Sequence, residues 1–515
     1  MAAWETVLSA LLLFLLAGLY LAGAFRRQRA EEPPLDKGFL PWLGYALAFK
    51  KDGLELLQRM QKKHGDIFTL LIGGRFITFV LDPHSYGAIV KESKSKLDFD
   101  MFGSEVVSAL FRFSPAGEDH KLMMALSAKY LMGEGLAVMN QAMVENLQIV
   151  MFHKKGSRDE NGSWQQDGVY RFSCNTIFTA SFLSFFGHES EDKAEKKVNL
   201  TDHEIVQFEK LFEELHKFDL LVPSMVYKTL APGQRKEAQQ LYNFFWDILS
   251  VSKMHKRYNV CSWISEQERI WAEKGMPENI RARHLFLMLW AVQTNTGPAS
   301  FWVLIHLLKY PEAMEAARKE VDGLLKENGP RVKLGDQLID LTRKMLTKSP
   351  VLGSVIEETL RLKVRSILMR SVVKDMDLQM DNGRRYALRK GDRVALSPYV
   401  AAQTDPEVYP DPLTFRYDRF LNSNGLVKNF YKSGKKLKYY NVPFGIGPSK
   451  CPGRFFAVTE IKMFAFLMLA CFDLELVDGE EEIPPADKSQ FGFGTILPVH
   501  DIQFRYRLRC QLDTK

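Results

Sequence analysis

The segment that most constrains the fold is NVPFGIGPSKCPGRFFAVTEIKMF, residues 441–464, where a glycine-rich turn carries one cysteine directly ahead of an apolar helix. We predict that helix over residues 454–472, with Pro452 in its first turn and Cys451 at or just before the N-cap. Free backbone N–H groups and the positive end of the helix dipole would favour a thiolate there. This geometry suits a metal ligand, while a catalytic nucleophile and a buried structural cysteine stay open as alternatives.

Composition and cysteine usage exclude several classes of protein. The chain has 515 residues, of which 46% are hydrophobic and 25% charged, so it can bury a large core. A net charge of +7 is too small to indicate nucleic acid, and the sequence contains no nucleic-acid-binding motif. The cysteines are Cys174, Cys261, Cys451, Cys471 and Cys510, and none forms a C-x-x-C pair. This scatter argues against a disulfide framework and against a zinc cluster.

The N-terminus begins with a continuous apolar run, VLSALLLFLLAGLYLAGAF, over residues 7–25. Its length is that of a helix that spans a bilayer, and we predict a membrane anchor over residues 1–29. Arg26, Arg27 and Arg29 follow the run, so the positive-inside rule predicts a cytosolic chain beyond it. A cleaved signal peptide is disfavoured, because the positive charge follows the apolar run and no clear cleavage site is present.

The rest of the chain is predicted to form one mainly α domain, residues 46–515, behind a proline-rich hinge at residues 30–45. The segment GDIFTLLIGGRFITFVLDP predicts a β-hairpin around Gly73 and Gly74, and residues 374–395 predict a second group of short strands. Helices are predicted where apolar residues recur every three to four positions, over residues 204–215, 239–252, 283–309, 311–326 and 349–362.

Phe444, Gly447, Cys451 and Gly453 meet the pattern F-x-x-G-x-x-x-C-x-G, and in it the chain resembles the cytochrome P-450 family of haem-thiolate enzymes. The resemblance implies that fold: a triangular, mainly helical domain with a small β region, behind the N-terminal transmembrane helix. It also implies haem b between two long helices, with residues 283–309 crossing its distal face. These four residues would bind the haem, with the cysteine as iron ligand.

Two further motifs occur before the cysteine in the order that the family shows. Glu358 and Arg361 form E-x-x-R, and residues 412–420 form P-x-x-F-x-x-x-R-F with Arg419 as its arginine. Alone, each is weak, because Glu–Arg pairs three residues apart are common on helix surfaces. Together they resemble the buried triad of the family, in which carboxylate–guanidinium pairing supports the cysteine turn.

Longer phrases place the chain within one branch of the family. PWLGYALAF and FGFGTILPVHDIQFRYRL are similar to the branch of sterol 12α-hydroxylase and prostacyclin synthase, and HKFDLLVPSMVY is closer to the hydroxylase. This implies NADPH- and O2-dependent hydroxylation of a sterol or bile-acid precursor, most closely 12α-hydroxylation of 7α-hydroxycholest-4-en-3-one. Electrons would come from NADPH-cytochrome P-450 reductase at the endoplasmic reticulum membrane. Isomerisation of a prostaglandin endoperoxide is the alternative, and haem binding without catalysis is a third.

The predicted distal helix departs from the family at two positions. Thr294 and Asn295 stand where an acid and a threonine usually follow one another. The amide of Asn295 can hold water or dioxygen, but it relays protons less readily than a hydroxyl. We predict that Asn295 positions dioxygen during catalysis. The alternative is that it bonds its own backbone.

The predicted propionate and substrate contacts also differ. Ser449 replaces a basic residue that the wider family often has, so Arg370 is the better propionate partner by resemblance, ahead of His120 or Lys121. Arg365 and Ser366 lie in the loop expected near the substrate, and the arginine either extends to solvent or meets a polar group of the substrate.

The resemblance places Trp290, Thr495 and Ile496 near the substrate, although a tryptophan on an apolar helix is often core packing. A basic stretch, YKSGKKLKYY, precedes the cysteine turn. Such a stretch is usually a solvated loop, but its expected place on the proximal face suits docking of an acidic reductase. Its lysines are Lys432, Lys435, Lys436 and Lys438.

Overall fold

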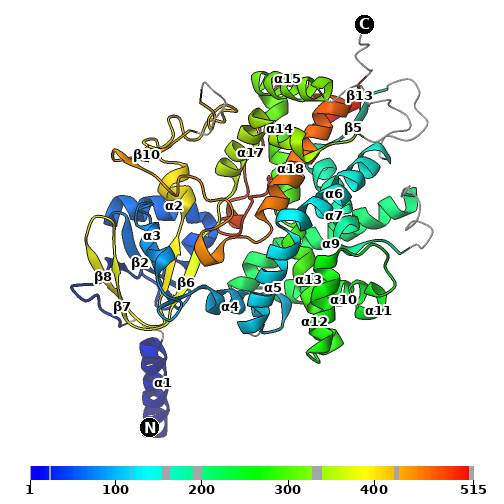
Figure 1. The fold of residues 1–515 in the computed structure, drawn as a ribbon. Coiled ribbons are helices and arrows are strands. Elements are labelled where there is room, and N and C mark those ends of the chain that lie inside the picture. Colours follow the sequence, from blue (N-terminus) through cyan, green and yellow to red (C-terminus); the bar gives the residue numbers. More distant parts are fainter. Residues whose placement is uncertain are drawn as a thin grey trace.

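A computed structural model describes residues 2–21, 25–115, 117–153, 163–189, 200–327, 339–422 and 428–509; Cys510 lies outside these ranges. A large helical body packs beside a smaller region of strands, and the first helix projects away from both (Figure 1). The predicted mainly α architecture with a small β region is confirmed.

The bounds of the helices within the described part of the chain are as follows. They are α1 (Ala2–Leu21), α2 (Ala46–His64), α3 (Tyr86–Lys91), α4 (Phe99–Phe111), α5 (Gly117–Tyr130), α6 (Gly133–His153), α7 (Val169–Phe186), α9 (Asp202–Val226), α10 (Pro232–Ile248), α11 (Val251–Met254), α12 (Ser262–Glu273), α13 (Glu278–Gln293), α14 (Thr296–Lys309), α15 (Pro311–Glu327), α16 (Arg343–Thr347), α17 (Pro350–Lys363) and α18 (Arg454–Cys471).

The strands are short and form several sheets. They are β1 (Leu35–Asp36), β2 (Ile67–Ile72), β3 (Arg75–Val80), β4 (Leu97–Asp98), β5 (Gln165–Gly168), β6 (Leu368–Val372), β7 (Met376–Gln379), β8 (Arg385–Leu388), β9 (Arg393–Leu396), β10 (Tyr431–Lys432), β11 (Lys435–Lys436), β12 (Phe472–Leu476) and β13 (Gln503–Leu508). Six of them form one sheet in the order β1-β2-β3-β9-β6-β4. Smaller sheets are β12-β13-β5, β7-β8 and β10-β11.

The predicted hairpin is confirmed as β2 and β3, which pair antiparallel from Ile67 opposite Val80 to Ile72 opposite Arg75. Its two turn residues, Gly73 and Gly74, have φ values of 57° and 76°. A two-residue turn needs this left-handed backbone because it then follows the twist of the strands. Strands of the second predicted group are also present, as β7, β8 and β9.

The core of the body is built around α7, α14 and α18, which lie together in the middle of Figure 1. Residues 172–186 of α7 and 296–307 of α14 are buried without interruption. A helix that is covered on every side belongs to the interior of a large protein, so these helices form the scaffold for the outer ones. A Cβ on Gly297 of α14 would meet the Cys174 sulfur of α7 at 3.3 Å, which shows how closely they pack.

The prediction of one continuous helix over residues 283–309 is wrong, because α13 ends at Gln293 and α14 begins at Thr296. Pro298 explains the break. Proline has no N–H to donate, and its ring would clash with the carbonyl four residues earlier, at Thr294. The chain therefore leaves the helix there and restarts with Pro298 in the first turn of α14, where no N–H is needed.

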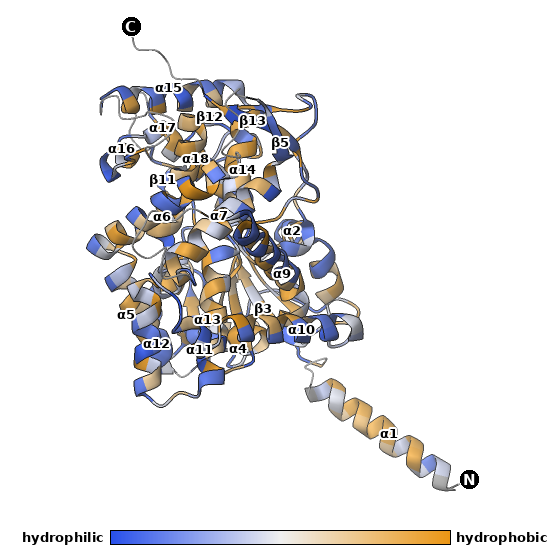
Figure 2. Ribbon diagram, turned by 90° about the vertical axis from the view of Figure 1, so that its right-hand side faces the viewer, coloured by the Kyte–Doolittle hydropathy of each residue, from blue (hydrophilic) through white to orange (hydrophobic). Residues whose placement is uncertain are grey.

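Helix α1 projects from the body and consists mostly of hydrophobic residues (Figure 2). Large apolar side chains along it, among them Leu8, Leu13 and Phe14, are exposed. Among the described residues, no single helix is both long and apolar enough to cross a membrane, and the apolar helix over Trp4–Tyr20 is shorter than that. The chain that follows is fastened to the six-stranded sheet. Arg26 forms two contacts of 2.6 and 2.7 Å with Asp392, and β1 pairs with β2.

Candidate active site

The cysteine turn is closed by its own backbone. The N–H of Cys451 donates to the carbonyl of Phe444 at 2.8 Å. Gly445 and Gly447 have φ values of 71° and 59°, which other residues rarely adopt. Helix α18 starts at Arg454 with Gly453 as N-cap, so Pro452 precedes the helix and the prediction that it lies in the first turn is wrong.

Electrostatics at the half-buried thiol only partly match the prediction. Burial raises the pKa of Cys451, whereas the N–H groups of Gly453 and Arg454 and the positive charge of Arg454 act in the opposite direction. The helix N-terminus alone therefore does not favour the thiolate. A metal ion at the sulfur would, because a coordinating thiol is deprotonated. A Cβ on Gly453 would meet no atom within 4 Å, so the chain leaves room beside the turn for a bulky group.

Arg370 of β6 lies against the same turn. Its Nη2 donates to the Ser449 hydroxyl at 3.2 Å and faces the Ile446 carbonyl at 3.5 Å. The side chain is buried, and burial lowers its pKa, while the more distant charge of Asp98 acts in the opposite direction. Within the described part of the chain no carboxylate forms an ion pair with it, and a buried guanidinium without such a contact is costly. The site therefore fits an anionic group of a cofactor, such as a haem propionate.

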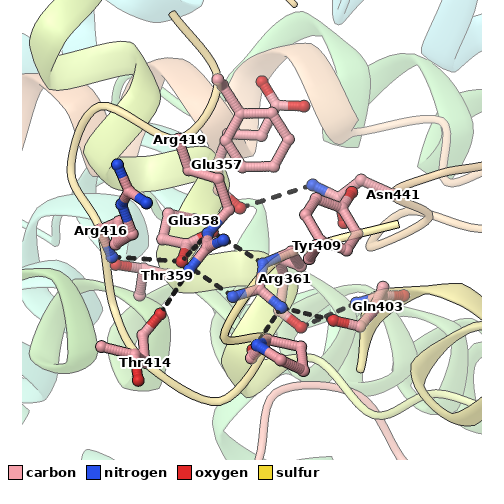
Figure 3. Close-up of polar contacts among 12 residues, drawn as sticks. Glu357, Glu358, Thr359, Arg361, Gln403, Tyr409, Thr414, Arg416, Arg419 and Asn441 are labelled. Atoms are coloured by element: carbon pink, nitrogen blue, oxygen red, sulfur yellow. Dashed lines mark hydrogen bonds and ion pairs between the residues drawn. The ribbon is translucent and has the colours of Figure 1, made fainter. Parts of the chain in front are cut away.

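Glu358, Arg361 and Arg419 meet in the interior, as Figure 3 shows. Arg361 binds the Glu358 carboxylate through Nε and Nη2 at 2.7 and 2.8 Å, and Arg419 Nε binds the same carboxylate at 2.7 Å. Arg361 also donates to the Pro412 carbonyl at 2.7 Å, and Arg419 to the Thr414 carbonyl at 2.7 Å. The cluster thus joins α17 to the loop of residues 410–419.

That loop leads directly to the cysteine segment. The guanidinium of Arg361 stacks 4.6 Å from the Tyr409 ring, and the Tyr409 hydroxyl donates to the Tyr440 carbonyl at 3.0 Å. Asn441, the first residue of the cysteine segment, reaches the Glu357 carbonyl of α17 at 3.4 Å. These contacts give the buried ion cluster a physical route by which it can position the turn.

Asn295 lies in the break between α13 and α14, and its side chain does not bond its own helix. Its Oδ1 accepts the N–H of Thr495 at 3.0 Å, which joins the break to the C-terminal loop. No group among the described residues bonds the Asn295 NH2, and the residue is exposed. The Thr294 hydroxyl donates to the Trp290 carbonyl at 3.0 Å, so it is used within α13.

The three residues predicted to face the substrate have different surroundings. Trp290 Nε1 donates to Asp219 Oδ1 of α9 at 3.0 Å. Thr495 lies beside Asn295, as described above. Ile496 is fully buried, its carbonyl accepts Trp302 Nε1 at 2.7 Å, and its side chain is therefore in protein packing.

The remaining predicted residues lie away from the turn or at the surface. His120 faces Asp100 at 3.6 Å and Lys121 is exposed, which leaves Arg370 as the propionate candidate in contact with the turn. Arg365 stacks 4.7 Å from the Tyr399 ring and, with Asp52, lines a pocket near α2.

Among the lysines before the turn, Lys432 pairs with Asp405 at 2.7 Å and Lys435 with Asp381 at 2.9 Å. Lys436 and Lys438 are exposed and pair with no described carboxylate.

Sequence reasoning missed two acids, the partly buried Asp219 and the fully buried Glu460. Asp219 of α9 accepts from Trp290, and burial raises its pKa to about 7. Glu460 of α18 is fully buried and accepts from the Ser181 hydroxyl of α7, and burial raises its pKa to about 8. One signal was available, since each acid interrupts an apolar stretch, FDLLV or FFAVTEIKMF. An unpaired charge on an apolar helix face needs a special environment.

A cysteine turn that leaves room for a bulky group, a buried guanidinium beside it and a mainly helical body fit a haem-thiolate protein. A profile of the family described as cytochrome P450 matches residues 33–504. The chain belongs to the cytochrome P450 family, and the predicted resemblance is confirmed.

Individual relatives match from end to end. The chain is 44% identical over 511 residues, and 99% of each chain, to 5-beta-cholestane-3-alpha,7-alpha-diol 12-alpha-hydroxylase of Sus scrofa. It is 43% identical over 509 residues, and 99% of each chain, to 7-alpha-hydroxycholest-4-en-3-one 12-alpha-hydroxylase of Homo sapiens. Identity to prostacyclin synthase of Homo sapiens is 40% over 494 residues, covering 94% of this chain and 95% of that one. Family and relatives identify a cytochrome P450 monooxygenase.

Proposed function

We propose that this chain is an NADPH- and O2-dependent haem-thiolate monooxygenase of a sterol or bile-acid precursor, and that its reaction is 12α-hydroxylation of 7α-hydroxycholest-4-en-3-one. The observation that carries the proposal is the full-length identity of 43–44% to enzymes named for 12α-hydroxylation. It is joined by a cysteine turn whose surroundings fit haem.

The haem site is proposed from residues that surround the turn. Cys451 is the iron ligand of haem b, Phe444, Gly447 and Gly453 shape the site, and Arg370 binds a propionate. When bound, the haem supplies the oxidising chemistry, because a cysteinate ligand favours O–O cleavage. The chain itself positions the cysteine turn, because the buried cluster of Glu358, Arg361 and Arg419 fixes the turn by the contacts described above.

Asn295 is proposed to hold dioxygen or a water through its NH2 group. Its Oδ1 already accepts from Thr495, which fixes the rotation of the amide and leaves the donor end without a described partner. An amide donates a hydrogen bond without giving up a proton. Asn295 therefore orients a small oxygen ligand, and water delivers the proton.

The membrane placement of the chain is proposed from its N-terminal helix, and the docking site of its reductase from the basic loop before the cysteine turn. Helix α1 is proposed to anchor the chain, by a single pass, in the endoplasmic reticulum membrane, with the catalytic domain in the cytosol. Exposed apolar side chains on α1 and the arginines after it support this placement. NADPH-cytochrome P-450 reductase is the proposed electron donor, docking at Lys436 and Lys438.

Reconstitution of the purified holoenzyme tests the proposal. The reduced, carbon-monoxide-treated protein should show the red-shifted Soret band of cysteinate ligation, and Cys451→Ala should lack it while Cys471→Ala keeps it. With reductase and NADPH, 7α-hydroxycholest-4-en-3-one should gain a 12α-hydroxyl group. Turnover of a prostaglandin endoperoxide without NADPH, and none of the sterol, would instead establish the isomerase alternative. Two observations favour that alternative: the 40% identity to prostacyclin synthase, and the presence of Thr294 and Asn295 in place of an acid and a threonine, since isomerisation needs no proton relay.

A further inference from the structure

Asp219 is a partly buried carboxylic acid on the α9 helix. Its Oδ1 accepts the indole N–H of Trp290 on α13 at 3.0 Å. Trp290 is itself held by an edge contact with the Phe111 ring at 5.7 Å between centroids. One carboxylate oxygen is thus fixed by a tryptophan that is packed in place.

The second oxygen of Asp219 is free to bind something. No described residue donates to Oδ2, yet this atom is not among the buried polar atoms without a partner, so it keeps solvent-accessible surface. Its neighbours along α9, Phe218 and Leu221, are buried in the apolar core. An accessible acceptor beside buried apolar side chains can orient a mostly apolar molecule, as the few polar groups of a ligand site do.

Among the described residues, no cation forms an ion pair with the Asp219 carboxylate. Burial raises its pKa to about 7. The nearest titratable groups do not change this. Burial lowers the pKa of His216, one turn earlier on α9, and burial raises the pKa of Tyr170 on α7. Near neutral pH the acid is partly protonated and can both donate and accept a hydrogen bond.

We propose that Asp219 determines specificity by hydrogen-bonding, through Oδ2, to an oxygen substituent on the ring system of the sterol. This assignment rests on the sterol function proposed above. The names of the relatives give substrates with oxygens at carbons 3 and 7, as a 3α,7α-diol or as a 7α-hydroxy-3-ketone. A group that donates and accepts serves a hydroxyl or a ketone equally, whereas a fixed donor such as lysine would favour the ketone.

The contact between Asp219 and Trp290 can influence which carbon of the sterol is oxidised, because Trp290 lies close in sequence to Asn295. Trp290 lies on α13, and Asn295 follows it by five residues, in the break after that helix. A rigid ring system held at Asp219 would therefore keep a fixed orientation relative to this break. Since a displacement of about 1 Å can cost a hundredfold in rate, losing this hydrogen bond should change which carbon is oxidised.

The experiment measures substrate affinity of the holoenzyme in four proteins: wild type, Asp219→Leu, Asp219→Asn and the control Glu213→Gln, an exposed acid on the same helix. The ligands are 7α-hydroxycholest-4-en-3-one and its 3-deoxy and 7-deoxy analogues. Asp219→Leu should weaken binding of the parent sterol roughly tenfold, as one hydrogen bond is worth. For one of the two deoxy analogues, the affinities of Asp219→Leu and of the wild type should differ by no more than about twofold. The oxygen that this analogue lacks is then the one that Asp219 binds. Asp219→Asn should retain most affinity, and Glu213→Gln all of it.

Product analysis supplies the second readout, because Asp219→Leu should spread hydroxylation over several carbons whereas Asp219→Asn should not. Equal loss of affinity for all three sterols would show a structural role and overturn the assignment, leaving the proposed function intact. If the wild type binds none of the sterols, the proposed function fails, and the assignment fails with it.

Discussion

Glu460 shows what burial does to a single side chain in the core of this protein. Its carboxyl lies between α7, α14 and α18, where the Ser181 hydroxyl donates to Oε1 and the Thr296 hydroxyl is adjacent. Oε2 is buried without a partner. Burial raises the pKa to about 8, so the group is a neutral acid at pH 7. Three central helices therefore meet at an acid whose protonated form is favoured by burial.

We expect the stability of the fold to depend on pH through Glu460. Its folded pKa of about 8 lies above the ordinary value of 4.5, so its stabilising effect is complete below pH 4.5 and is lost as pH rises to 8. Within this window, each unit of pH changes the free energy of unfolding by about 1.4 kcal/mol at most. Glu460→Gln removes the dependence. The unfolding temperature of the wild type should fall relative to Glu460→Gln between pH 5 and pH 9.

The control is Glu480→Gln, which changes an exposed acid. Its unfolding temperature should run parallel to that of the wild type across the same pH range. A constant difference between wild type and Glu460→Gln from pH 5 to pH 9 would show that the acid does not titrate in this window.

At the scale of elements, the predictable parts are those that local chemistry decides. The β2–β3 hairpin and the helices α15, α17 and α18 follow from periodicity and from glycine or proline at their ends. The break at Thr294 could not be placed from periodicity, since the apolar pattern continues through it. The residue that indicates the break is Pro298, because the proline ring clashes with the carbonyl of the residue four positions earlier in a continuous helix.

The candidate site also has parts that local sequence predicts and parts that depend on long-range packing. The cysteine turn and the E-x-x-R motif are local patterns, so the sequence predicts them. The Asp219–Trp290 contact joins residues 71 positions apart, and the Asn295–Thr495 contact joins residues 200 apart. Such pairs are set by how helices and loops pack, which a single sequence does not state.

The helix break itself can be tested at Asn295. Asn295→Asp keeps an acceptor for the Thr495 N–H but loses the NH2 donor, whereas Asn295→Ala loses both. We expect Asn295→Asp to retain the unfolding temperature and Asn295→Ala to lose about 1 kcal/mol of stability. Both should form less product per NADPH consumed. Full coupling in Asn295→Ala would contradict the proposed role of the amide, whatever its effect on stability.

The junction between α17 and the loop of residues 410–419 is a second element that can be tested. Arg419→Leu leaves part of the buried Glu358 charge uncompensated and should cost roughly 3–5 kcal/mol. Arg416→Leu changes a half-exposed arginine of the same loop and should stay within about 0.5 kcal/mol. Chemical unfolding and haem content measure both effects. Equal losses in the two variants would show that the loop, rather than its buried ion pair, sets the stability.

At the scale of the whole molecule, the proposed reaction depends on a reductase that docks at the face carrying the basic loop before the cysteine turn. Two lysines before the cysteine turn are already neutralised within the chain, Lys432 by Asp405 and Lys435 by Asp381. Lys436 and Lys438 are exposed and pair with no carboxylate in the described ranges. Their charge is therefore available to an acidic partner, and it adds to an overall charge of +7.

Reversing both charges, Lys436→Glu with Lys438→Glu, should lower the reductase-supported rate roughly tenfold at low salt, because encounter between charged proteins is steered electrostatically. The difference from wild type should shrink toward 1 M salt, where the Debye length falls to about 3 Å. Lys210→Glu with Lys236→Glu changes the net charge equally at exposed positions on α9 and α10, and should have little effect. Turnover driven by a peroxide in place of reductase should be the same in all three proteins. A rate that is lowered equally in both double variants would mean that net charge, rather than this loop, governs the encounter.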